Sequence, residues 1–365
     1  MAKPAKSKYL LIGSIEAYSG KSATVLGITH QLNEQGIQVA YGKPLGTCLS
    51  NNPKDIVERD ISFVTDILGL SSEQIHPTLL NLDHDTIARR LLGKDAQDYA
   101  QALQDYVQSI EGELVLLEGA SSLWEGSLFN LSIPELANAV DGSILLVTRY
   151  SSLSLVANLL TAKQFLGDRL LGITINDVPQ DNLKDVQDLI VPYLEQNNIP
   201  VLAVLPKDQL LNSVSVRELA KRLDAKVLCR SDRLDLMVES LSIGAMNVNS
   251  ALEFFRQRKN MVVVTGGDRT ELQMAALETS TNCLIVTGRV MPKPLILNRA
   301  EDLEIPILAV DSDTLTTVEI VDAAFGKVPI REPIKVQRIR DLMKEYFDFD
   351  RLSAALGLVP LGSQK

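Results

Sequence analysis

The stretch Gly13–Ser22, which reads GSIEAYSGKS, constrains the fold of this chain more than any other part of it. It follows a short apolar run, Tyr9–Ile12, and leads into a segment with helical patterning. A phosphate cradle needs backbone N–H groups that close around an anion, the positive end of a helix dipole, a lysine and a hydroxyl for Mg²⁺. Gly20, Lys21 and Ser22 supply these features in the required order. The sequence therefore predicts a strand, a phosphate-binding loop and a helix at the start of an α/β domain.

The loop departs from the strict GxxxxGK[ST] pattern at one position, because Ile15 stands where the first glycine is expected. An ordinary strand-to-helix turn that contains Gly-Lys-Ser by chance is the alternative. The apolar strand before the loop and the helix after it favour the phosphate site. We expect Ser19, Gly20, Lys21 and Ser22 to surround the phosphates, with Ser22 also a Mg²⁺ ligand.

Short apolar runs alternate with longer amphipathic segments along residues 1–226, as in a parallel α/β sheet. The expected strands are Tyr9–Ile12, Val39–Gly42, Leu114–Leu117, Ser143–Val147, Gly172–Ile175 and Val201–Val204. The expected helices include Ser22–Glu34, Ile87–Ile110, Ser154–Phe165 and Leu183–Glu195. Strands that are apolar throughout are typical of burial on both faces. The predicted fold class is therefore α/β, a P-loop parallel sheet flanked by helices.

A second, smaller α/β unit begins near Lys226. Its expected strands are Val227-Leu228, Met261–Val264, Leu284–Val286 and Ile307–Val310, and its expected helices include Asp232–Leu241, Ser250–Arg256 and Thr314–Ala324. We therefore divide the chain into a P-loop domain over 1–226, a second domain over 227–330 and a helical tail over 331–365. The tail contains the basic amphipathic stretch Ile334–Tyr346, which is expected to pack on either domain or on a partner.

Three further side chains are candidates for the phosphate site. A carboxylate at the end of a later strand is the usual partner of a P-loop serine on Mg²⁺, and Glu118 has that position, unless it only caps the strand end. Asp60 is a second candidate metal ligand or a plain charge at a helix N-terminus. Lys43 ends the second strand, at the sheet edge where α/β ligands bind, although an exposed strand-end lysine is equally consistent.

One loop of the second domain carries both glycine and charge. It comprises Gly266, Gly267, Asp268, Arg269 and Thr270, between an expected strand and an expected helix. Such a loop either binds a small anion or nucleotide or contacts a second subunit. The alternative is a glycine turn in which Asp268 caps the helix and Arg269 is solvated.

Composition excludes several classes of partner. The net charge of −10 argues against a nucleic-acid partner, whose backbone needs a basic surface. No run of apolar residues is long enough to span a membrane, and no signal peptide is recognisable at the N-terminus, so we expect a soluble cytoplasmic protein. The three cysteines and three histidines show no metal-ligand spacing.

Several of these segments carry a resemblance to known families. Gly13–Ser22, Lys43-Pro44 and Glu118-Gly119-Ala120 resemble the dethiobiotin synthetase fold, and are most similar to the synthetase-like N-terminal domain of long bacterial phosphate acetyltransferases. Further matches are Gly172–Asn176, Leu205–Asp208 and Ser215–Glu218. The stretches Ile243–Met246, Thr265–Thr270 and Thr287-Gly288 resemble the DRTGG domain that follows in those proteins. The resemblance covers roughly residues 8–330.

The resemblance implies ATP and Mg²⁺ as cofactors. It makes Lys21 and Ser22 phosphate and Mg²⁺ groups, Glu118 a Mg²⁺ ligand, Lys43 a cation that faces substrate or phosphate, and Asn176 a contact to the nucleotide base.

Two positions depart from the synthetase pattern. Ser14 stands where the synthetase loop begins with glycine, and Ser121-Ser122 replaces a glycine pair. Nothing matches the residues that position the diaminopelargonic acid substrate.

In the long acetyltransferases a catalytic acyltransferase domain follows, and too few residues follow Pro329 here to form one, so we expect no acetyl transfer. The expected function is that of a nucleotide- or phosphometabolite-binding regulatory protein. The alternatives are an ATP- and Mg²⁺-dependent ligase or carboxylase of the dethiobiotin synthetase type, and a scaffold with a vestigial loop. Whether the chain is an enzyme stays open, and no catalytic residue is assigned. Exposed sheet edges and the resemblance predict a homo-oligomer.

Overall fold

The computed structural model describes residues 8–47, 67–108, 112–244, 247–327, 330 and 332–358. The chain divides into two compact units, which we describe separately. The first unit comprises Met1–Lys207 together with Ile330–Lys365, and the second comprises Asp208–Pro329. Residues 208–226 therefore belong with the second unit, whereas the sequence places the boundary at 226.

The first unit is built on a parallel sheet with the strand order β4-β2-β6-β1-β7-β8-β9. Its strands are β1 (Lys8–Gly13), β2 (Val39–Gly42), β4 (Ile75–His76), β6 (Leu114–Glu118), β7 (Ser143–Arg149), β8 (Leu170–Val178) and β9 (Val201–Pro206). In the central register Leu11 lies opposite Leu117 of β6 and Ile144 of β7. The residues of β2 and β6 are buried throughout, as a sheet covered on both faces requires. A separate parallel pair joins β3 (Leu45–Thr47) to β5 (Leu80–Leu82).

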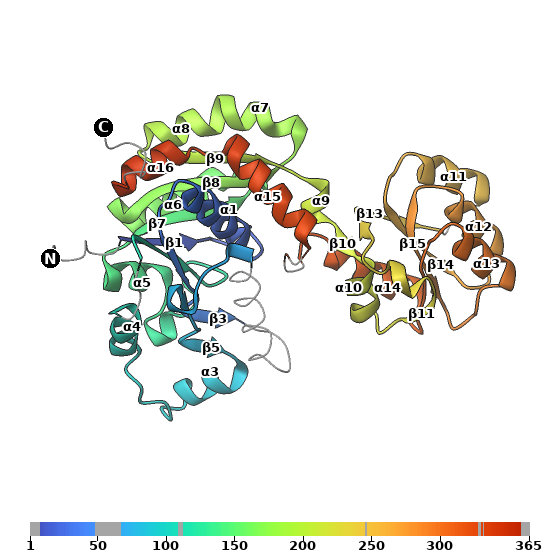
Figure 1. Ribbon diagram of the computed structural model, residues 1–365, viewed down its shortest axis with the longest axis horizontal. Helices are drawn as coiled ribbons and strands as arrows, with labels where there is room; N and C mark the ends of the chain where they lie inside the picture. The colour runs from blue at the N-terminus through green and yellow to red at the C-terminus, as the bar shows by residue number, and fades with distance from the viewer. Residues whose placement is uncertain are drawn as a thin grey trace. The chain divides into compact units, whose positions relative to one another are not determined.

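Helices flank both faces of this sheet (Figure 1). They include α1 (Lys21–Glu34), α3 (His84–Leu91), α4 (Tyr99–Gln108), α5 (Ile133–Val140), α6 (Leu155–Leu166), α7 (Leu183–Asp185) and α8 (Val191–Gln196), with a π-helical stretch over Val186–Ile190. The single helix predicted over Ile87–Ile110 is wrong, because α3 and α4 are separate helices. Gly93 turns the chain with a φ of 66°, and the side chain of Asp98 accepts hydrogen bonds from backbone N–H groups at the start of α4.

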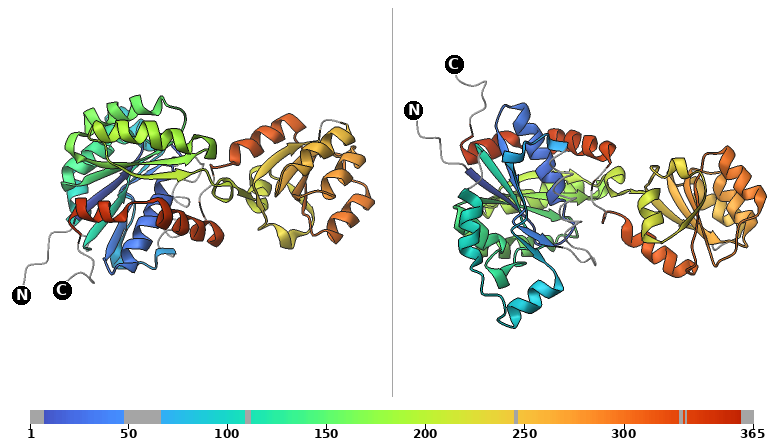
Figure 2. Two further views of the ribbon diagram at one scale, coloured as in Figure 1. Left: turned by 90° about the horizontal axis from the view of Figure 1, so that it is seen from above. Right: turned by 60° about the horizontal axis from the view of Figure 1, so that its bottom comes forward.

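The C-terminal residues complete the first unit with α15 (Pro333–Tyr346) and α16 (Phe349–Leu356), both visible in red in Figure 2. Helix α15 packs on α1 at Gly27, where a Cβ atom would lie only 2.3 Å from Cγ of Met343. Phe347 bridges to Ala203 of β9, and the backbone N–H of Asp348 donates to the carbonyl of Leu202 at 2.8 Å. The tail therefore covers an edge strand of the first sheet.

The second unit is a five-stranded sheet with the order β11-β16-β15-β14-β13. Its strands are β11 (Lys226–Cys229), β13 (Ser240–Ile243), β14 (Met261–Gly266), β15 (Thr281–Thr287) and β16 (Ile307–Ala309), and only β11 runs antiparallel to its neighbour. Its helices are α9 (Gln209–Asn212), α10 (Val216–Arg222), α11 (Val248–Arg256), α12 (Thr270–Leu277), α13 (Pro294–Asp302) and α14 (Thr314–Ala324). Separate apolar clusters fill the two faces of the sheet.

The helix predicted over Asp232–Leu241 is wrong. A short 3₁₀ turn over Ser231–Arg233 is followed by β12 (Met237–Val238), which pairs antiparallel with β10 (Val214–Ser215). Val238 is fully buried in this pairing, so burial against a partner distant in sequence overrides the local helical pattern.

Candidate functional site

The predicted phosphate-site residues of the first unit lie where its parallel strands end. Glu118 is the last residue of β6, Lys43 follows β2, and the loop Gly13–Gly20 joins β1 to α1. Strand β1 lies between β6 and β7, and the chain builds the sheet first to one side of β1 and then to the other. Open α/β sheets bind ligands at the carboxyl ends of strands where the strand order reverses in this way.

Gly20 gives the loop its final turn into α1. It adopts the left-handed conformation with φ 104°, and a Cβ atom there would lie 2.4 Å from Nδ2 of Asn176. That nitrogen donates a hydrogen bond of 2.9 Å to the carbonyl of Ser19. Helix α1 begins at Lys21 without a side-chain cap, so its first N–H groups are available to an anion.

Glu118 lies at the centre of a cluster of polar side chains at this edge of the sheet. Its Oε1 accepts a hydrogen bond of 2.8 Å from the Ser22 hydroxyl and lies 3.7 Å from Nζ of Lys43, while its Oε2 accepts one of 2.9 Å from the hydroxyl of Tyr41. Burial alone would raise the pKa of Glu118, but Lys43, Lys21 and the two hydroxyl donors together hold the pKa of this carboxyl below its usual range. Glu118 is therefore an ionised carboxylate at neutral pH.

Lys21 completes the cluster with a second cation. Its ammonium donates a hydrogen bond of 2.8 Å to the hydroxyl of Ser14. Burial lowers the pKa of Lys21, and the nearby Lys43 lowers it further against the opposing pull of Glu118. A phosphate oxygen would relieve this electrostatic cost by supplying a negative charge.

Two acidic side chains hold backbone segments at this edge of the sheet. Glu16 accepts a hydrogen bond of 2.6 Å from the backbone N–H of Arg149 and one of 3.2 Å from the Thr148 hydroxyl. Glu125 accepts one of 2.6 Å from the backbone N–H of Ser121. Glu16 therefore ties the loop to the end of β7, and Glu125 holds the segment that follows β6.

The structure brings together Gly20, Lys21, Ser22, Lys43 and Glu118, as the sequence predicts. Asp60 lies outside the described residues. Asn176 anchors the Ser19 carbonyl, a contact that the sequence did not predict, and the buried hydroxyl of Ser19 itself has no hydrogen-bond partner among the described residues.

Tyr41, Ser14 and Glu16 belong to the site and were missed as site residues by the sequence reasoning. Only Tyr41 carries a usable signal, since it is a polar phenol in an otherwise apolar strand two residues before Lys43.

The contact between Gly20 and Asn176 gives a testable prediction. The variant Gly20→Ala should lose about 3 kcal/mol of unfolding free energy, because a Cβ adds both left-handed strain and a collision with the Asn176 amide. Gly93→Ala is the matched control, since Gly93 also has a positive φ but open space around it, and about 1 kcal/mol is expected there. Denaturant unfolding measures both, and equal losses would show that the collision does not matter.

The loop Gly266–Thr270 of the second unit joins β14 to α12. The backbone N–H of Gly267 donates to the carbonyl of Thr287 at 3.1 Å, and the amide of Gln273 donates to the carbonyl of Gly266 at 2.8 Å. No hydrogen bond or ion pair joins the side chains of Asp268 and Arg269 to the described part of the chain, so Asp268 does not cap α12. In this sheet β13 to β16 follow one another in chain order, without the reversal that marks the first site.

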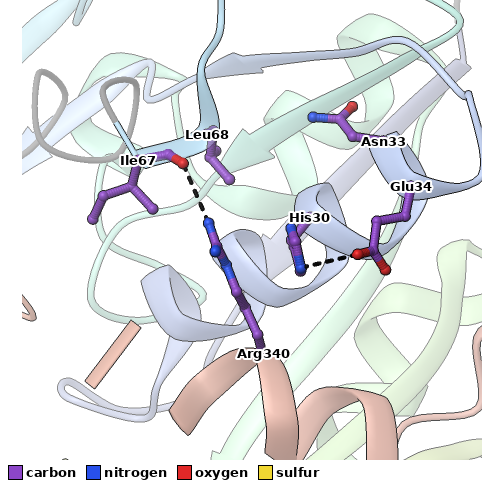
Figure 3. Close-up of a pocket in the computed structure, with 6 residues that line it drawn as sticks. All are labelled: His30, Asn33, Glu34, Ile67, Leu68 and Arg340. Carbon is purple, nitrogen blue, oxygen red and sulfur yellow. Dashed lines mark hydrogen bonds and ion pairs between the residues drawn. The ribbon is translucent and has the colours of Figure 1, made fainter. Parts of the chain in front are cut away.

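A cavity of about 290 Å³ lies at the other end of α1 from the loop (Figure 3). It is lined by His30, Asn33, Glu34, Ile67, Leu68 and Arg340. The guanidinium of Arg340 donates to the carbonyl of Ile67 at 3.4 Å, and Nε2 of His30 lies 3.5 Å from Oε1 of Glu34. Burial, aided by Arg340, lowers the pKa of His30. The cavity shares no residue with the phosphate site.

Two family models match this chain. One, described as an AAA domain, matches residues 8–215, and the other, described as a DRTGG domain, matches residues 218–324. No helix among the described residues is both long and apolar enough to cross a membrane.

The curated relatives are phosphate acetyltransferases. The enzyme of Nitratidesulfovibrio vulgaris is 23% identical over 377 residues, covering 96% of this chain and 52% of the relative. That of Synechocystis sp. is 25% identical over 364 residues, covering 94% of this chain and 51% of the relative. The chain thus spans about half the length of the curated relatives it matches, and the resemblance to this group is confirmed.

Among solved structures, the CBS and DRTGG domains of the regulatory region of Clostridium perfringens pyrophosphatase, complexed with the activator diadenosine tetraphosphate, are 18% identical. The match covers 42% of this chain and 74% of that one, with a TM-score of 0.29, which is too low to support any conclusion about this chain.

Proposed function

This chain belongs to the AAA-domain family matched over residues 8–215, with a DRTGG domain behind it, and from that premise we propose that it is a regulatory protein that binds a nucleotide or a phosphorylated metabolite. The observation that carries the proposal is the convergence of Lys21, Lys43 and the uncapped start of α1 around one strand end of the first sheet. Two cations and free N–H groups at a helix start are the elements of an anion site.

Ser22 and Glu118 are the residues that would hold Mg²⁺. Their oxygens lie 2.8 Å apart, and a hydroxyl with a carboxylate is the hard oxygen donor set that Mg²⁺ prefers. Mg²⁺ bound there would neutralise phosphate charge. The chain itself contributes the orientation, because Tyr41 fixes the second oxygen of Glu118.

Binding of ligands with and without Mg²⁺ tests the proposal. ATP, GTP, inorganic pyrophosphate and an acyl phosphate are titrated into the full chain by calorimetry, with 5′-nucleosides as uncharged controls. We expect saturable binding of at least one phosphate ligand, stronger with Mg²⁺ than with EDTA. Binding by none of them would overturn the proposal.

A second candidate function is that of an ATP- and Mg²⁺-dependent ligase or carboxylase of the dethiobiotin synthetase type. It is favoured by the complete set of Lys21, Ser22, Lys43 and Glu118, which a pure scaffold would not need. In such an enzyme Lys21 and Lys43 would stabilise charge on a phosphoryl group in transfer. Release of ADP from ATP in the presence of a panel of carboxylic and amino acids would support it, and binding without turnover favours the regulatory function.

We also propose that the chain forms a homo-oligomer through its second unit. Large apolar side chains are exposed at the end of β13 and in the segments that follow β15 and β16, at Ile243, Val290, Met291 and Leu315. Apolar side chains left exposed at one end of a sheet are available to a second copy of the chain. Analytical ultracentrifugation of the full chain tests this, and a single monomeric species up to high concentration would overturn it.

A further inference from the structure

Ser14 is a buried serine in the phosphate loop, with no exposed surface. Its hydroxyl accepts the hydrogen bond from the Lys21 ammonium at 2.8 Å. It has carbonyl acceptors of its own at Glu16, 2.7 Å away, and at Ser121, 3.1 Å away. Because a hydroxyl has one proton, it can donate to one of these at a time while it accepts from Lys21.

Both oxygens of the nearby Glu118 carboxylate already interact with groups other than Lys21. Oε1 of Glu118 is engaged by Ser22 and Lys43, and Oε2 by Tyr41. No carboxylate among the described residues forms an ion pair with Lys21. A cation in a partly buried site is therefore held by a neutral hydroxyl, and an anionic oxygen would hold it more strongly.

We propose that Ser14 is the resting partner of Lys21, holding the ammonium and yielding it to a phosphate oxygen when a ligand binds, so that Ser14 sets the affinity of the site for phosphate ligands. The proposal rests on the proposed function, since it presumes a phosphate ligand. Binding is then an exchange, in which the ligand must replace an existing hydrogen bond before it gains a new one.

The exchange favours one chemical class of ligand. A neutral or singly charged oxygen gains little over the Ser14 hydroxyl, whereas the oxygens of a free terminal phosphoryl group carry nearly two negative charges at neutral pH. We therefore expect ligands with a terminal phosphoryl group, such as nucleoside triphosphates, phosphomonoesters or acyl phosphates, to be preferred over phosphodiesters.

Two variants test the exchange. Ser14→Ala removes the hydroxyl, and Ser14→Gly restores the residue of the synthetase pattern without adding bulk. Both should bind ATP and inorganic pyrophosphate about tenfold more tightly than the wild type, because a hydrogen bond to a charged group no longer has to be given up. Their preference for phosphomonoesters over a phosphodiester should not decrease, because the cost of releasing Lys21 from Ser14 is the same for every ligand that displaces the hydroxyl. Ser122→Ala is the matched control, since it removes a hydroxyl from the neighbouring loop that makes no hydrogen bond to a described residue.

A ligand-free measurement accompanies the titrations. In a double-mutant cycle of unfolding free energy with Ser14→Ala and Lys21→Met, the two changes should be clearly non-additive, because each removes one side of the same hydrogen bond. A merely structural serine would lower the melting temperature, with no gain in affinity and no coupling to Lys21.

The outcomes separate the two proposals. Tighter binding by both Ser14 variants, or binding by them where the wild type shows none, supports the exchange. Equal or weaker binding by the variants, while the wild type binds, overturns the exchange and leaves the proposed function standing. If neither the wild type nor the variants bind any phosphate ligand, the proposed function is overturned and the exchange falls with it.

Discussion

Lys21→Met should weaken the binding of nucleoside triphosphate by about 100-fold, equivalent to about 3 kcal/mol. Methionine keeps the length and apolar stem of the side chain and removes only the ammonium. That ammonium is the one cation of the stretch Gly13–Ser22, and a phosphate oxygen would replace Ser14 as the acceptor of its hydrogen bond. Calorimetric titration of wild type and variant with Mg²⁺-ATP measures the loss.

The same variant should be more stable than the wild type when no ligand is present. Burial lowers the pKa of Lys21 below its unfolded value, so the folded state holds its positive charge at a cost. The cost is complete at neutral pH and fades as the pH rises through the lowered pKa, so the advantage of the variant should shrink in alkali. Lys184→Met, at an exposed lysine of α7, is the control and should change neither binding nor stability. A stable variant with unchanged affinity would remove Lys21 from the binding site.

Glu118→Gln should abolish the effect of Mg²⁺ on ligand binding, and should lower the unfolding free energy by about 3 kcal/mol. The amide keeps the shape of the side chain and one acceptor oxygen, but it leaves Lys43 and Lys21 without their shared counter-charge. Breaking a buried charge pair from one side costs more than the pair itself contributes, because the remaining charges stay desolvated. Titrations of ATP with Mg²⁺ and with EDTA, together with denaturant unfolding in EDTA, measure the two effects.

The stability effect has a defined pH dependence. The pKa of Glu118 in the folded state lies below its ordinary value of 4.5, so its stabilising contribution is complete above that value and is lost as the pH falls through the folded pKa. The difference between wild type and Glu118→Gln should therefore be constant near neutrality and disappear in acid. Glu113→Gln, at the exposed residue that precedes the same strand, should show neither effect. A pH-independent difference would mean that Glu118 acts through packing and not through charge.

The sequence was sufficient for six of the seven strands of the first sheet because each contains an uninterrupted apolar stretch, whereas the two-residue strand β4 was not predicted. Leu114–Leu117 and Val39–Gly42 are found at the predicted positions, since burial on both faces leaves no other use for such runs. The same reasoning gave a wrong prediction for the segment from Ile87 to Ile110, where one helix was expected and two are found. Its apolar spacing continues across Gly93, and only the positive φ of that glycine shows where the first helix stops.

The residues of the candidate site also differ in how well the sequence predicts them. Lys21, Ser22 and Glu118 were predictable because each belongs to a local pattern, a loop or a strand end. Asn176 was expected only through the family resemblance, and its contact with Ser19 was not predicted. That contact joins residues 157 positions apart, and a hydrogen bond of that kind has no signature in either segment. Tertiary contacts between distant polar residues decide which side chain faces a ligand and which one holds the loop.

The closure of the first unit by α15 and α16 has a consequence for the order in which the protein can mature. Both helices are made after all of the second unit, because the chain leaves the first unit at Lys207 and rejoins it at Ile330. During synthesis, α1 lacks its cover at Gly27, and β9 lacks the bridge from Phe347 until the ribosome has passed both positions. Until these last residues are translated, the first unit therefore exposes an apolar helix face and an unpaired strand edge to other molecules.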